Sequence, residues 1–97
     1  MRSLPNNPFI PAYRIILSNT CHLVFRCPYC DSRHLHGCGD GKLEQWRVSH
    51  CIHEKSELRC RNIRLLCVGE VASERMLPRF GLADLIEFNR VFGALKK

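Results

Sequence analysis

Cysteine and histidine residues gather in the middle of the chain, between Cys27 and His53, and this clustering constrains the fold more than any other feature. Cys27 and Cys30 are separated by only two residues, so both thiols can converge on one ion from a tight turn. A structural zinc ion needs four such ligands in a tetrahedron. Further candidates follow in the same segment: His34, His36, Cys38, His50, Cys51 and His53. The segment therefore predicts a structural metal site.

Strand geometry narrows the choice of ligands. His34 and His36 are two residues apart, so on an extended strand they share a face, and either one could reach the Cys27–Cys30 turn. His50 and Cys51 are adjacent and would point to opposite faces, so one of them binds the same ion; we favour Cys51. The unused histidine of the first pair could hold a ligand by a hydrogen bond. The candidate ligands for Zn²⁺ are thus Cys27, Cys30, His34, His36, His50 and Cys51.

The cysteines are interpreted as metal ligands because the chain has the features of a cytoplasmic protein. Three prolines and an arginine interrupt the N-terminal stretch, which is not the pattern of a signal peptide, and no segment reaches the roughly 20 apolar residues of a membrane span. Persistent disulfides are rare in a reducing compartment, and seven cysteines would leave one thiol over. Cys60 and Cys67 are expected to lie outside the site, and Cys21 has no assigned role.

The pattern of apolar residues predicts one small α+β domain over residues 1–97, β-rich and with one C-terminal helix. A β-branched and aromatic stretch at 13–17 and a second strand at 22–26 are expected to pair as a hairpin. Apolar residues at three- and four-residue spacing predict the helix, whose apolar stripe either covers the domain's own core, which we favour, or forms a homodimer. The expected segments are an extended arm (1–12), a metal-binding module (22–54), a strand region (58–71) and the C-terminal helix (82–95).

The metal-binding segment resembles a known motif. The order Cys27-Pro28-x-Cys30-x-x-x-His34-x-His36-Gly37, followed by a glycine-bearing loop and Arg47-Val48-x-His50-Cys51, is similar to small zinc-ribbon-like proteins of bacteriophages and prophages. The resemblance covers about residues 25–52. It implies a zinc-ribbon-like module in a mobile-element protein that works in the cytoplasm of a bacterial host, and it implies no particular activity. Here an insertion separates Gly41 from Arg47, and Cys38 is additional.

Motifs of catalysis are missing from the sequence. There is no H-E-x-x-H helix, no H-x-E with P-C-x-x-C of the zinc deaminases, no phosphate-binding glycine loop and no nucleophile elbow. We therefore expect a protein that is not an enzyme.

The charge distribution suggests what the protein binds. The net charge is +6; residues 21–54 are neutral, whereas residues 55–97 carry nine basic and five acidic side chains. Arg59, Arg61 and Arg64 could contact successive phosphates while Trp46 or Tyr29 stacks on a base. The prediction is a non-catalytic binding module for nucleic acid or a host nucleoprotein complex, with no membrane contact. The alternative is an inhibitor that binds a protein of the host's defence or regulatory machinery, where its basic flank occupies a phosphate-binding site.

Overall fold

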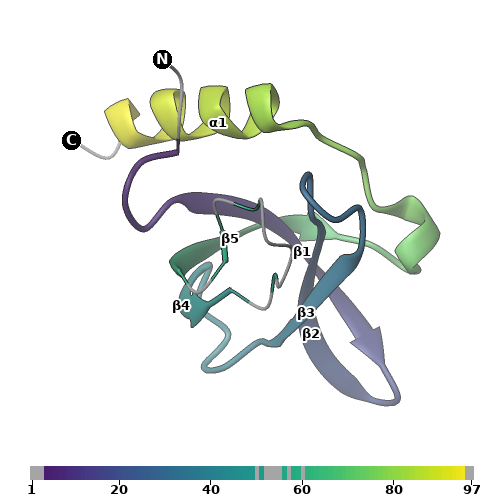
Figure 1. Cartoon of the computed structure of the whole chain (residues 1–97). Helices are drawn as coiled ribbons and strands as arrows, with labels where there is room; N and C mark the ends of the chain where they lie inside the picture. The colour runs from purple at the N-terminus through teal and green to yellow at the C-terminus, as the bar shows by residue number, and fades with distance from the viewer. Residues whose placement is uncertain (1–3, 50, 52–55, 57, 60, 96–97) are drawn as a thin grey trace.

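The computed structural model describes residues 4–49, 51, 56, 58–59 and 61–95. A mixed sheet and a C-terminal helix make up the described part of the chain (Figure 1). The strands lie in the order β3-β2-β1-β5-β4; β1 and β5 are parallel, and the other neighbours are antiparallel. The elements are β1 (Phe9–Leu17), β2 (Thr20–Arg26), β3 (Arg33–Gly37), β4 (Glu44–Val48), β5 (Asn62–Glu70), the short 3₁₀ helix η1 (Glu74–Met76) and α1 (Leu82–Leu95). The expected α+β class with one C-terminal helix is confirmed.

β1 is the central strand, and it begins earlier than the sequence suggested. Phe9–Ala12, which we assigned to an extended arm, form the first half of β1, and Phe9, Ile10 and Ala12 are buried. Pro11 has no N–H to donate to a neighbouring strand. This removes no hydrogen bond to β2, because β2 pairs with β1 only from Tyr13 onward. Pro11 therefore lies where only β5 pairs with the strand. Residues 1–3 of the predicted arm lie outside the described residues.

The remaining predicted elements agree with the structure apart from their ends. β1 and β2 form the expected hairpin, whose Ser18–Asn19 turn has positive φ at both residues, as in a type I′ turn. α1 spans the predicted range. The predicted strand region 58–71 is shorter, because Leu58 and Arg59 form a turn in which the Arg61 N–H donates to the Leu58 carbonyl, and β5 starts at Asn62.

The main core lies on one face of the sheet, which we call the inner face. Most of its fully buried members come from three strands and from α1: Ile10, Ala12, Leu23, Phe25, Ile63, Leu65 and Leu85; Cys27, Cys51 and Leu58 join them from the connecting segments. A second cluster on the outer face packs Ile15 and Val24 against Leu77 and Val71 from the segment before α1. Leu85 of α1 belongs to the main core, so the helix covers the domain's own core.

Asn89 fixes α1 to the start of β1. Its buried Oδ1 accepts a hydrogen bond from the Phe9 N–H (2.7 Å), and its Nδ2 donates to the carbonyls of Phe9 and Leu85 (both 2.9 Å). Phe92 adds an edge-on contact to the Phe9 ring, with centroids 4.7 Å apart. Figure 1 shows α1 running beside the sheet, next to the beginning of β1. No helix among the described residues is long and apolar enough to cross a membrane.

Candidate metal centre

Four side chains meet in a group that could hold a metal ion: Cys27, Cys30, His34 and Cys51. Their donor atoms all lie within 4.8 Å of one another. The sulfurs of Cys27 and Cys51 are 3.7 Å apart, and Cys30 Sγ is 3.4 Å from His34 Nε2. A zinc tetrahedron with bonds of about 2.3 Å to sulfur and about 2.0 Å to nitrogen has edges of about 3.8 Å and about 3.5 Å. The two separations therefore match tetrahedral coordination, and both are far too long for covalent bonds.

The local fold brings the first two ligands together in a tight turn after β2. The Cys27 N–H donates to the Ser32 carbonyl and the Asp31 N–H donates to the Cys27 carbonyl, both at 2.9 Å. Asp31 closes the turn with φ of 57°, a left-handed conformation that aspartate tolerates. The Tyr29 N–H lies 3.4 Å from Cys27 Sγ and donates to it. This turn, residues 27–31, is called the knuckle below.

The other two ligands come from opposite edges of the sheet. His34 lies on β3, directly opposite Phe25 of β2, while Cys51 follows β4. β3 and β4 are the two outermost strands in the order of the sheet. The donor group therefore joins the two edges of a curled sheet. A second link between the same two strands is a hydrogen bond in which Arg47 Nη2 on β4 donates to the carbonyl of Gly37 on β3 (2.9 Å).

Burial sets the chemistry of the group. Cys27 and Cys51 are 1% and 2% exposed, and His34 is 8% exposed. Burial raises the pKa of the Cys27 thiol to about 12; hydrogen bonds from the Cys30 and Tyr29 N–H groups act in the opposite direction, and the neighbouring Cys51 raises it further. A buried thiolate is costly unless a cation lies beside it, and a bound metal supplies that cation.

The structure selects among the predicted ligands. Of the histidine pair, His34 joins the donor group, whereas His36 is 5% exposed on the same face and stacks on the Phe25 ring outside the group. Cys51 joins the group, as favoured; His50 and His53 lie outside the described residues.

Two cysteines form a disulfide that was not predicted from the sequence. Cys38, considered as a ligand, is bonded to Cys21, which had no assigned role, across the ends of β2 and β3. Cys67 is a free, partly buried thiol packed against the main core, as expected for a small apolar residue. Cys60 lies outside the described residues.

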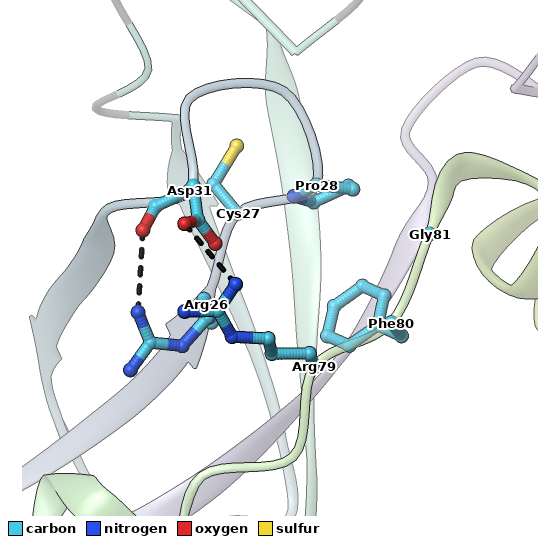
Figure 2. Close-up of a pocket in the computed structure, with 7 residues that line it drawn as sticks. All are labelled: Arg26, Cys27, Pro28, Asp31, Arg79, Phe80 and Gly81. Atoms are coloured by element: carbon cyan, nitrogen blue, oxygen red, sulfur yellow. Dashed lines mark hydrogen bonds and ion pairs between the residues drawn. The ribbon is translucent and has the colours of Figure 1, made fainter.

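A cavity of about 330 Å³ lies behind the knuckle (Figure 2). Arg26 Nη1 donates to the Asp31 carbonyl (3.2 Å), and Arg79 Nη1 pairs with the Asp31 carboxylate (3.3 Å). Phe80 and Gly81 form the opposite wall. In Figure 2 the sulfur of Cys27 points away from the two arginines. The two arginines therefore tether the knuckle to the sheet and to the segment before α1, on the side away from the Cys27 sulfur.

The predicted arginine surface is arranged differently from the expectation. Arg59 is exposed in a turn and Arg61 precedes β5, so the two do not share the face of an extended strand. Arg64 lies within β5, where its guanidinium carbon is 3.6 Å from the centre of the Phe9 ring and 5.5 Å from that of Trp46. Tyr29 packs against the main core. The neighbourhood of Arg64 did not follow from the predicted elements, because Phe9 was assigned to the extended arm and not to a strand beside β5.

Comparisons of the chain with protein-family models, with curated proteins and with solved structures found no match.

Proposed function

We propose that this protein is a non-catalytic nucleic-acid-binding module whose fold is held by one structural Zn²⁺. The observation that carries the proposal is the donor group of Cys27, Cys30, His34 and Cys51. Three sulfurs and one imidazole nitrogen fill a tetrahedral shell and leave no position for water or substrate, whereas a catalytic zinc keeps one position open. Sulfur-rich sets of this kind select zinc over the harder cations magnesium and calcium.

The role of the ion follows from the strands that it would connect. A zinc bound here joins the knuckle after β2 and His34 on β3 to the segment after β4, and so closes the curled sheet across its two edges. Metal binding then becomes part of the folding free energy. A knuckle completed by ligands from a distant segment is the arrangement of zinc-ribbon-like modules, and the proposed kinship with phage proteins rests on the residues of this motif.

Charge favours nucleic acid as the partner. The chain carries +6, and the excess lies outside the metal-binding segment, which is neutral. Among the predicted contacts Arg59 is exposed, and Arg64 lies beside the exposed ring of Trp46. Cations next to an exposed aromatic ring are the usual elements of nucleic-acid binding.

The test has two measurements on one preparation. Protein purified without added zinc should contain about one equivalent of zinc per chain. It should also bind labelled DNA or RNA with an affinity that falls steeply with salt, since phosphate contacts release counterions. Less than half an equivalent of zinc would contradict the structural role, and no binding of either nucleic acid at low salt would contradict the choice of partner.

The exposed edge strand β4 favours one second candidate, an inhibitor that docks on a host protein. Leu43, Trp46 and Val48 are 64%, 54% and 58% exposed at this edge of the sheet. Exposed apolar side chains that lie close together are typical of a protein-binding surface. Capture of partners from host lysate with and without nuclease separates the candidates, because a protein target survives nuclease treatment whereas a nucleic-acid bridge does not.

A further inference from the structure

The geometry points to a stacking site for single-stranded nucleic acid on the outer face of the sheet, formed by Trp46 and Arg64. This inference rests on the proposed nucleic-acid binding and goes beyond it, because it names the surface and the form of the ligand. Three side chains on three adjacent strands build the site: Phe9 on β1, Arg64 on β5 and Trp46 on β4. We call them the aromatic–arginine row.

Strand register creates the row. Arg64 is the direct partner of Phe9 in the parallel β1–β5 pair and of Trp46 in the antiparallel β5–β4 pair. Directly opposed residues of neighbouring strands project from the same face of a sheet. The guanidinium of Arg64 is close to both rings, at 3.6 Å from the centre of Phe9 and 5.5 Å from the centre of Trp46.

Arg64 is held in place before any ligand arrives. Its Nε–H donates to the Asn7 carbonyl (2.8 Å), and its guanidinium covers the Phe9 ring. Phe9 is itself 3% exposed and is fixed by Asn89 and Phe92 of α1. The cation–π contact with Phe9 already restricts the Arg64 side chain in the free protein. Binding of a ligand to the guanidinium therefore costs little further side-chain entropy.

Trp46 presents an open ring beside that plane. It is 54% exposed although a tryptophan gains much from burial. The segment that covers the outer face packs against Ile15 and Val24, and the aromatic–arginine row is not part of that cluster. Arg47, the next residue on β4, is held by its hydrogen bond to Gly37 and is not part of the row.

This combination suits an unpaired base. Stacking on an indole requires a base whose face is free, and in a duplex both faces are already stacked on neighbouring bases. A base on Trp46 places its backbone within reach of a cation fixed 5.5 Å from the ring. The chain's net charge of +6 supplies the long-range attraction that any such strand needs.

The only tryptophan of the chain lies in the proposed site, so its fluorescence reports on the site directly. The probes are a dT oligonucleotide, a U oligonucleotide and a DNA hairpin duplex of equal charge, each added to the zinc-loaded full chain. We expect saturable quenching by the single strands and weaker binding of the duplex. Labelled oligonucleotides then measure the affinity of the variants by fluorescence anisotropy.

Three substitutions and one control separate the contributions. Trp46→Leu should weaken single-strand binding about tenfold or more, and Trp46→Phe should restore much of it, because the ring is what stacks. Arg64→Gln should weaken binding and lower the salt slope by roughly 0.7, the value of one phosphate contact on a single strand. Ile16→Ala, at the other end of β1 and 59% exposed, should leave binding unchanged.

The outcomes distinguish failure of this inference from failure of the proposed function. This inference would be overturned, and the proposed function left intact, if the oligonucleotides bound without quenching the fluorescence of Trp46 and if Trp46→Leu bound them with unchanged affinity. Equal affinity for the duplex would overturn the assignment to single strands. No binding of any probe at low salt would overturn the inference together with the proposed function. Quenching of Trp46 by both dT and U strands, together with an affinity by anisotropy that is weakened in Trp46→Leu and kept in Ile16→Ala, supports it.

Discussion

His34 and His36 offer a matched comparison of single residues, because both are buried on the same face of β3. Only His34 belongs to the donor group. We expect His34→Ala to lower the zinc content below half an equivalent and the Tm by about 12 °C or more, which corresponds to about 3 kcal/mol in a domain of this size. His36→Ala removes the same imidazole volume and should keep about one equivalent. Elemental analysis and thermal unfolding measure both; zinc kept by His34→Ala but lost by His36→Ala would reverse the assignment.

Cys27 makes metal binding depend on pH. Burial raises the pKa of this thiol to about 12 in the metal-free fold, so at neutral pH the thiol is protonated and must lose a proton to bind the ion. Protons therefore compete with zinc, and affinity falls as pH falls. At least one proton is displaced, so we expect the apparent affinity to drop at least about tenfold per pH unit. Chelator titrations between pH 8 and pH 6 measure this slope, and a flat profile would contradict coordination by the Cys27 thiolate.

The sequence predicted three members of the donor group, Cys27, Cys30 and Cys51, by type and spacing but left the histidine open. Its selection depends on the register of the β2–β3 hairpin. His34 lies opposite Phe25, two residues before Cys27, whereas His36 lies opposite Leu23, four residues before it. Two residues correspond to about 6.6 Å along a strand, which takes His36 away from the knuckle. The two-residue spacing of His34 and His36 predicts that they share a face of β3, but it does not predict which of them lies closer to the knuckle.

Among the elements, α1 depends on Asn89 for its attachment to β1. This amide supplies a donor and an acceptor to the backbone of Phe9, in the part of β1 that β2 does not reach. Asn89→Ala would leave buried backbone groups without partners, so we expect a loss of about 2–3 kcal/mol in the free energy of unfolding. Arg90→Ala, next in the helix, removes only an exposed ion pair with Glu87 and should cost under about 0.5 kcal/mol. Urea unfolding compares them; equal stabilities would show that Asn89 is not an anchor.

An element could be predicted when the residues that determine its conformation lie within the element itself. α1 has an apolar repeat of its own, and its range was predicted correctly. The first half of β1 was not predicted as a strand, because Pro8 and Pro11 are residues that usually interrupt strands. Its strand conformation depends on the parallel partner β5, more than fifty residues away. Asn89 reads as a polar residue on an apolar stripe, and its role depends on a contact 80 residues distant. Local pattern therefore gave the helix and the hairpin, whereas the centre of the sheet required tertiary pairing.

For the whole molecule, the metal group acts where the sheet has the least support of its own. β1 lies at the centre, paired on both sides and covered by α1, whereas β3 and β4 each have one strand neighbour. Across the two edges, the described contacts are the donor group and the hydrogen bond from Arg47 to Gly37. Cys21–Cys38 ties β2 to the end of β3 but does not reach β4. An ion bound by this donor group, as proposed, would therefore be the main link that closes the sheet.

Removal of the metal should therefore loosen the molecule unevenly. Regions with few supporting contacts open at lower free energy than the core. After chelation we expect faster amide hydrogen exchange in β3 and β4, with smaller changes in β1, β5 and the first turns of α1. Exchange measured by mass spectrometry on zinc-loaded and chelated protein checks this, and zinc added back should restore protection. A uniform loss of protection would mean that the ion is needed for the whole fold, and unchanged exchange at β3 and β4 would contradict the idea that it closes the sheet.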